Sequence, residues 1–309
     1  MTSCARTASV IPIVRRMAKR REATTHGVCV VDKPAGVTSH DVVGMLRRRF
    51  DERQVGHAGT LDPDATGVLV IAVGMATRLL RFVEKTNKRY TGEVVLGVET
   101  STLDAAGQIT ATYDMTGVTV DAAREAAATH LTGAITQVPP MVSAIKVGGR
   151  PLHELARQGI EIEREPRPVT VHSFTVDAGP EPGVLAIAVE CSAGTYVRTL
   201  AADLGRLLGG GAHLRNLRRT AVGEFSIDDA GPPDTAALLP VDTAVRALPR
   251  VVVDADVAAK VANGRVLPGF DGSGPWAVYD RAERLLAVYE TFRDTESKPS
   301  VVLPTAPEK

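Results

Sequence analysis

The sequence has little of what marks secreted, membrane-spanning or metal-dependent proteins. Its 309 residues include three cysteines, which lie far apart and form neither a disulfide framework nor a metal-binding pattern. The seven histidines do not fall at metal-ligand spacing either. No apolar run approaches the roughly 18 residues of a membrane span. We therefore expect a cytoplasmic protein in a reducing compartment, without a metal ion or a membrane anchor.

The sequence also lacks a nucleotide-binding motif and an excess of charge of either sign. Three glycines, 209–211, are not followed by the Gly-Lys-Ser/Thr of a P-loop, so the sequence gives no sign of an organic cofactor. The formal net charge is zero, but its distribution is uneven. Residues 1–100 carry 16 basic and 10 acidic side chains, residues 195–223 carry 5 and 1, and residues 224–309 carry 9 and 14. Such a cationic face is compatible with a polyanionic partner.

The first residues differ in composition from the rest of the chain. Residues 1–26 are basic and polar without a sustained hydrophobic period, and we expect them to form a disordered extension. The segment resembles an organelle transit peptide in composition, or it results from a start codon placed before Met17. The remaining length is enough for one large domain and one small domain.

Residues 56–80 join a tight turn to a buried strand. Residues 68–73 are continuously apolar and rich in β-branched side chains, which predicts a buried strand, and helical spacing follows it. Three glycines and Pro63 precede the strand and set the backbone of a turn that carries Asp62. An Asp-Pro pair alone indicates a simple turn. A carboxylate on a tight loop beside a rigid strand is also typical of a catalytic group.

The complete stretch is more specific than that pair. It resembles the signature G-H-x-G-x-L-D-P-x-A-[ST]-G-x-L of the bacterial TruB-type tRNA pseudouridine synthases, which isomerise uridine 55 of the T-arm. Every fixed position matches, and Asp64 occupies a variable position that is mostly apolar in the family. This second carboxylate either raises the pKa of Asp62 or faces water; the sequence leaves both open.

Further blocks of the same family follow in the right order between residues 27 and 223. They are K-P-x-G-x-T-S at Lys33, K-x-Y at Tyr90, T-x-T-x-D-x-x-G at Asp104, C-S-x-G-T-Y-[IV]-R at Tyr196 and Arg198, and A-H-x-x-x-L-R-R-T at Leu217, Arg218 and Arg219. Val142 and His153 stand where the family usually has aromatic residues. Five ordered blocks are much harder to match by chance than one short motif.

The resemblance implies an α+β fold. We expect residues 27–240 to form a pseudouridine synthase domain on a mixed, mainly antiparallel sheet with flanking helices. Residues 168–176 and 183–191 read as an antiparallel pair of strands, and residues 197–208 as a helix. Residues 250–305 are expected to form a small PUA-like domain, and the last residues to be disordered.

The resemblance also implies the reaction and its residues. Uridine becomes pseudouridine without a cofactor, and the substrate is the T-arm of tRNA bound by a monomer. Asp62 is the catalytic carboxylate, paired with Arg198, which we expect to lower its pKa. Tyr90 stacks on the uracil and is able to move a proton, while Tyr196 and Leu217 complete the slot. His57 fills the space left by the flipped base, and the remaining expected contacts to the cleft or RNA are Lys33, Asp104, Arg218 and Arg219.

Two other functions share parts of this pattern. A guide-RNA-dependent pseudouridine synthase carries the same catalytic signature, although the complete amino-terminal block favours the stand-alone type. A non-catalytic tRNA-binding or folding factor would need the RNA-binding residues but not Asp62. For Asp104, a turn-forming role and a role near the RNA are both open, and for Arg198 the alternative is a solvated surface charge.

Overall fold

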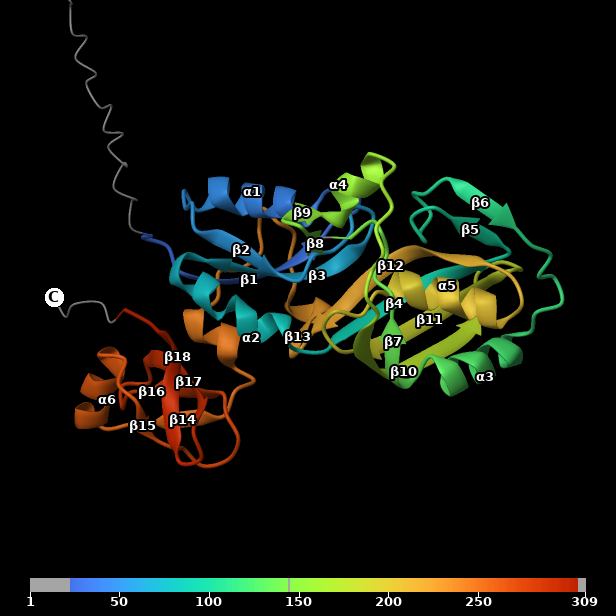
Figure 1. The fold of residues 1–309 in the computed structure, drawn as a ribbon. Coiled ribbons are helices and arrows are strands. Elements are labelled where there is room, and N and C mark those ends of the chain that lie inside the picture. The colour runs from blue at the N-terminus through green and yellow to red at the C-terminus, as the bar shows by residue number, and fades with distance from the viewer. Residues whose placement is uncertain (1–22, 144, 305–309) are drawn as a thin grey trace, which may run out of the picture.

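A computed structural model describes residues 23–143 and 145–304. Its centre is a nine-stranded sheet with the order β1-β3-β12-β4-β11-β10-β7, to which β2 and β13 add at β3 and β12 (Figure 1). All its pairs are antiparallel except β3 with β12. The predicted α+β fold on a mixed, mainly antiparallel sheet is therefore confirmed.

The strands of the large sheet are β1 (Gly27–Lys33), β2 (Val55–Ala58), β3 (Thr66–Val73), β4 (Lys88–Leu96), β7 (Gly133–Gln137), β10 (Arg167–Ala178), β11 (Val184–Cys191), β12 (Ala212–Val222) and β13 (Phe225–Ser226). The helices are α1 (Ser39–Arg49), α2 (Leu80–Glu84), α3 (Val120–His130), α4 (Leu152–Arg157), α5 (Val197–Leu207) and α6 (Ala255–Ala262). Two small hairpins are β5 (Val98–Thr100) with β6 (Ile109–Thr112), and β8 (Lys146–Val147) with β9 (Arg150–Pro151).

The first half of the large sheet, which contains β1, β2 and β3, carries α1 on one face (Figure 1). Thr38 and Asp41 form the capping box that the sequence indicates, because each side chain accepts a hydrogen bond from the other residue's backbone N–H. Strand β3 is buried over almost its whole length, as a continuous apolar run requires. The helical spacing after β3 becomes a 3₁₀ turn over residues 74–79 and then α2.

The second half of the sheet has its own apolar core. The predicted hairpin of β10 and β11 is present, and α3 and α5 pack on the sheet. Helix α5 turns Val197, Leu200 and Leu204 into this core, which fixes the direction of the residues at its amino-terminal end. Strand β12 lies between β3 and β4 and so joins the two halves.

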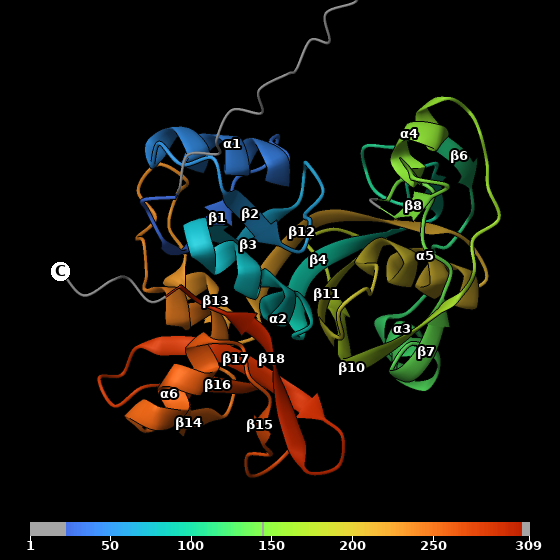
Figure 2. The same cartoon turned by 60° about the vertical axis from the view of Figure 1, so that its left-hand side comes forward.

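A second sheet, with the order β14-β16-β17-β18-β15, lies beside the first half of the large sheet (Figure 2). Its strands are β14 (Arg250–Val252), β15 (Leu267–Pro268), β16 (Trp276–Tyr279), β17 (Leu285–Phe292) and β18 (Glu296–Val302). Val288 and Val301 of this sheet share one apolar cluster with Leu79 and Phe82, so the two sheets are packed together through a common core.

The ends of the chain differ from expectation in two places. Residues 24–26 belong to the predicted disordered extension, yet the backbone N–H of Thr24 bonds to Glu52 and His26 Nδ1 accepts from the backbone of Met75. The rest of the predicted extension, residues 1–22, lies outside the described residues, as do residues 305–309. Strand β18 is not in the sequence-based expectation. In the described part of the chain, no helix is long and apolar enough to cross a bilayer.

The common core predicts a strong effect of one leucine. Leu79→Ala, at a fully buried position in the cluster shared by both sheets, should lower the free energy of unfolding by about 2–5 kcal/mol. Urea unfolding followed by circular dichroism measures this loss. Leu207→Ala is the matched control, because Leu207 is 44% exposed and its truncation should cost less than about 0.5 kcal/mol. Equal losses would contradict a shared core.

Candidate active site

The side chains of Ser39 and Lys33 form hydrogen bonds to the backbone of the loop between β2 and β3. Ser39 Oγ donates to the carbonyl of Leu61 and accepts from its backbone N–H, at 3.1 and 2.9 Å. Lys33 is fully buried, and its Nζ donates to the carbonyls of Pro34, Val37 and Pro63 at 2.7–2.9 Å. Because the loop backbone is bonded on both sides of Asp62, its carboxylate projects from a rigid support.

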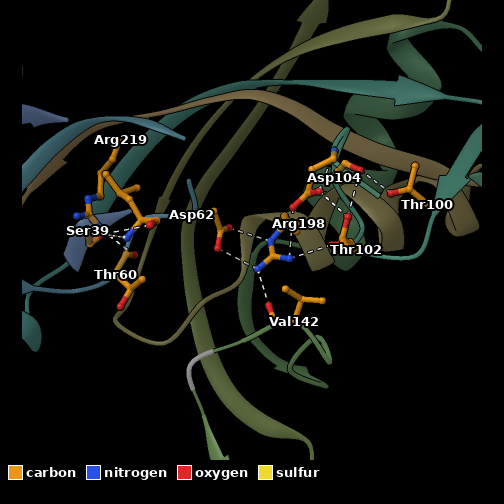
Figure 3. A network of polar contacts seen from close by, with 11 residues as sticks. Ser39, Thr60, Asp62, Thr100, Thr102, Asp104, Val142, Arg198 and Arg219 are labelled. Atoms are coloured by element: carbon orange, nitrogen blue, oxygen red, sulfur yellow. Dashed lines mark hydrogen bonds and ion pairs between the residues drawn. The ribbon is translucent and has the colours of Figure 1, made fainter. Parts of the chain in front are cut away.

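Asp62 meets Arg198 in a two-pronged ion pair (Figure 3). Arg198 Nε lies 3.0 Å from Asp62 Oδ2, and its Nη2 donates to Oδ1 at 3.2 Å. The remaining guanidinium N–H groups donate to the carbonyls of Thr102 and Val142, and Nη1 lies 3.4 Å from Asp104 Oδ2. The predicted pairing is therefore present, and Arg198 is buried rather than a solvated surface charge.

The ionisation of Asp62 differs from expectation in its net direction. Burial raises the pKa of Asp62 above its ordinary value, and the opposing effect of Arg198 does not fully compensate. The predicted effect of Arg198, which is to lower this pKa, is therefore present, but burial outweighs it and the net shift is upward. The acidic neighbour that raises the pKa further is Asp104. Asp64 is exposed, which answers the question that its unusual position raised.

Asp104 forms the turn that was one of its two predicted roles and also contacts Arg198, while its role near the RNA stays a prediction. Its Oδ1 accepts from Thr102 Oγ1 and from the backbone N–H of Ala106, which forms a turn. Its other oxygen faces Arg198. Asp104 thus orients the guanidinium from the side opposite Asp62, and a single cation holds two carboxylates that would otherwise repel each other.

Two cavities meet at the ion pair. One, of about 300 Å³, is lined by Asp62, Tyr90, Tyr196, Arg198 and Leu217, among others. The other, of about 380 Å³, lies against the same Asp62, Arg198 and Leu217 and extends past Asp104. The first has two tyrosine side chains on its wall and a carboxylate at its edge. It can therefore hold a flat polar ring in contact with an ionisable group.

A bulge in β12 and a pair of hydrogen bonds from Gln137 position two of these side chains, Leu217 and Tyr196, at the first cavity. The pairing of β12 with β4 shifts register between Arg215 and Arg218, and Asn216 takes a positive φ of 51° within this bulge. Leu217 follows immediately and reaches the cavity wall. Tyr196, at the start of α5, is fixed by Gln137, which bonds to both its backbone N–H and its carbonyl.

Other predicted site residues lie away from the cavity wall. His57 is half-buried on β2, its Nδ1 has no hydrogen-bond partner within the described residues, and burial lowers its pKa. Lys33 lies beneath the loop, and burial lowers its pKa to about 8. Arg218 forms a two-pronged pair with Asp32 at the edge of β1 and is about one-third exposed.

Arg219 lines the first cavity, as predicted, but it is deeply buried there. Only 1% of it is exposed, and its guanidinium donates to the carbonyls of Val68, Gly59 and Thr60. The donors of this guanidinium are bonded to the protein backbone, so the structure gives Arg219 a role within the loop, and its contact with RNA stays a prediction.

Several groups that build the site were not singled out from the sequence. Ser39, Asn216 and the carbonyls of Thr102 and Val142 are the main ones. The Val142 contact is made by the backbone, so the absence of an aromatic side chain there leaves it unchanged. The side chain of His153 lies outside the described part of the structure. Within residues 23–143 and 145–304, no group of three or more His, Cys, Asp or Glu side chains is arranged to hold a metal ion.

Comparison with solved structures gives the class. The chain aligns with a chain in a Cbf5-Nop10-Gar1 complex at a TM-score of 0.64 and 26% identity, covering 90% of this chain and 84% of the other. A chain of an H/ACA RNP bound to a substrate RNA has the same fold, with a TM-score of 0.63. Together with the family models that match residues 47–233, this fold defines a pseudouridine synthase.

Sequence comparison gives the family. Residues 47–197 match the amino-terminal domain of the TruB family of pseudouridylate synthases, and residues 198–233 match the tRNA pseudouridylate synthase B C-terminal domain. The chain belongs to the TruB family, whose members form pseudouridine in tRNA. The tRNA pseudouridine synthase B of Rhodococcus jostii is 46% identical over 90% of this chain and 94% of the relative. That of Streptomyces coelicolor is 46% identical over 88% and 96%.

The ion pair predicts how activity depends on pH. Activity that needs an ionised Asp62 should fall on acidification at a higher pH than an ordinary carboxylate would give, because the pKa of Asp62 is raised. Arg198→Met removes the cation that opposes this rise. The acid limb of the pH profile of kcat/KM should move to still higher pH, with a loss of roughly 10²-fold at its maximum.

The measurement is conversion of uridine in a tRNA transcript between about pH 4 and pH 8, the range that brackets a raised carboxyl pKa. Arg124→Met is the control, because Arg124 pairs with Asp121 and Asp177 on the surface of α3. An acid limb that stays in place in Arg198→Met would show that Arg198 does not act on the titrating group.

Proposed function

We propose that the protein converts the uridine at position 55, in the T-arm of tRNA, to pseudouridine by flipping the base into the cavity of about 300 Å³. The observation that carries this proposal is the two-pronged pair of Asp62 and Arg198 at the wall of a cavity that also contains Tyr90, Tyr196 and Leu217. Family membership supplies the reaction, and the cavity supplies a place for one extruded base.

The proposed chemistry is an isomerisation and needs no oxidant or reductant. The bond between N1 of uracil and C1′ of the ribose breaks, the uracil turns, and a bond between C5 and C1′ forms. C5 then loses a proton and N1 ends with one. Asp62 takes part as an ionised carboxylate, either attacking the sugar or deprotonating and stabilising it. Arg198 keeps Asp62 ionised and fixes the direction of its oxygens.

The proposed slot holds the base while it is detached. Tyr90 stacks on the uracil and is placed to move a proton, and Leu217 and Tyr196 close the slot so that the base turns without leaving. Extruding a base from a folded loop costs a few kcal/mol. We propose that His57, which is neutral because burial lowers its pKa, fills the space that the base leaves.

The proposed partner is the T-arm stem-loop alone, bound by a monomer in the cytoplasm. Arg218 of β12, which pairs with Asp32 of β1, is the proposed contact to the RNA backbone near the cavity. Such contacts give an affinity that falls with salt, while the choice of substrate rests on the shape of the loop and its unstacked bases. We assign catalysis to a domain of residues 27–240 and regard residues 250–305 as a separate PUA-like domain, since a second sheet begins at Arg250.

Two aspartates on one loop provide a matched test. Asp62→Asn should lower the rate of pseudouridine formation in a T-arm hairpin by at least about 10³-fold, because an amide neither attacks the sugar nor accepts its proton. Binding of the hairpin should remain. Asp64→Asn is the control, since Asp64 is exposed two residues away and its variant should keep its rate. The product is mapped by carbodiimide modification and primer extension.

The same assay separates the alternatives. Conversion of a bare hairpin without any guide RNA excludes a guide-dependent enzyme, and a transcript with cytidine at position 55 shows whether that site is the one modified. Conversion by Asp62→Asn at the wild-type rate would refute the role of Asp62. Binding without conversion by the wild type would refute activity on the T-arm hairpin.

A further inference from the structure

Arg219 is a buried cation whose guanidinium bonds to three backbone carbonyls, one in β3 and two in the loop before it. Its Nε donates to the carbonyl of Val68 at 2.7 Å, and its Nη2 donates to that of Gly59 at 3.0 Å. A third, longer bond of 3.5 Å joins Nη1 to the carbonyl of Thr60 (Figure 3). The side chain therefore connects the beginning of strand β3 to the loop that carries Asp62.

The same residue lies directly beside Tyr90. In the antiparallel pairing of β12 with β4, Arg219 is opposite Tyr90, and both residues line the first cavity. Burial raises the pKa of the Tyr90 phenol, and the positive charge of Arg219 opposes this rise. On its other side β12 pairs in parallel with β3, where Arg219 is opposite Gly67. A Cβ atom on Gly67 would lie 2.1 Å from the Arg219 carbonyl, so the glycine permits this close approach.

The charge of Arg219 is not explained by packing alone. Taking a cation out of water costs several kcal/mol, and apolar side chains of similar size usually stabilise a core as well or better. Here the guanidinium is placed where its forked donors satisfy the carbonyls of a loop that has no regular secondary structure. Its planar shape sets the distance between that loop and the tyrosine strand.

We propose that Arg219 is a positioning residue that holds the Asp62 loop and the Tyr90 ring at a fixed separation, so that both reach the same uridine. The proposal rests on the proposed roles of Asp62 and Tyr90. It predicts that Arg219 acts on the chemical step and not on RNA affinity, because its donors are bonded to the loop and to β3 although the residue borders the first cavity.

The neighbouring arginines provide a matched pair of variants. Arg219→Met should lower kcat on the T-arm hairpin by roughly 10²-fold, the effect of a misplacement of about 1 Å, with KM and the dissociation constant of the hairpin changed less than about threefold. Arg219→Lys keeps the charge but not the fork, and should recover only part of kcat. Arg218→Met, at the half-exposed neighbour, should instead weaken hairpin binding and leave kcat closer to that of the wild type.

A second readout is independent of activity. The five tyrosines can be labelled with ¹³C at Cζ, and the Tyr90 resonance assigned with Tyr90→Phe. Loss of the Arg219 cation opposite Tyr90 should shift this resonance in Arg219→Met, and the resonance should stay in place in Arg218→Met. Thermal unfolding of each variant shows that the protein compared is folded.

The outcomes are distinct. Weaker hairpin binding with an unchanged kcat in Arg219→Met would overturn the proposal and return Arg219 to RNA contact. An unchanged enzyme would overturn it as well, and so would failure of both Arg219 variants to fold, which would make the residue purely structural. A wild-type protein that does not convert the hairpin would count against the proposed T-arm substrate, whereas an unmoved Tyr90 resonance would count against the positioning role alone.

Discussion

The pairing of Asp62 with Arg198 joins two parts of the chain that are 136 residues apart and defines the site. Asp62 is on a loop before a central strand, and Arg198 is in the first turn of α5, on the other half of the sheet. A buried guanidinium that loses its carboxylate partners raises the free energy of the folded protein. Any movement that separates the two halves of the sheet would therefore be unfavourable. The proposed chemistry and the arrangement of the two halves therefore involve the same contact.

Burial and charge act in opposite directions on Asp62, the proposed catalytic carboxylate. The side chain of Asp62 is 40% exposed, whereas that of Arg198 is 4% exposed, so the cation is the more deeply held partner. Burial raises the pKa of Asp62, Asp104 adds to this, and Arg198 and Lys33 oppose it. The fixed cations thus offset part of the cost of burying this carboxylate, and in the proposed reaction a substrate that displaces the remaining water would strengthen their effect on it.

Much of the fold follows from the sequence because its signals are local. The apolar run of β3, the capping box at Thr38 and the apolar face of α5 each specify an element without reference to the rest of the chain. Strand β18 was missed because it contains polar residues and Pro299, which lies opposite Tyr289 next to a shift in register. Its strand character comes from pairing on both sides, which a local pattern does not contain.

The burial of Arg219 follows from strand geometry and is not predicted by matching the motif that contains it. Two consecutive arginines in a strand must point to opposite faces, so one of them faces inward whenever that strand is central. Arg218 faces Asp32 at the rim, and Arg219 faces the interior. The sequence contained the alternation, but a motif that groups both residues hides it. The inward arginine, together with Lys33 on the opposite side, places positive charge beneath the Asp62 loop before any RNA arrives, so the electrostatic support for that loop is built into the fold.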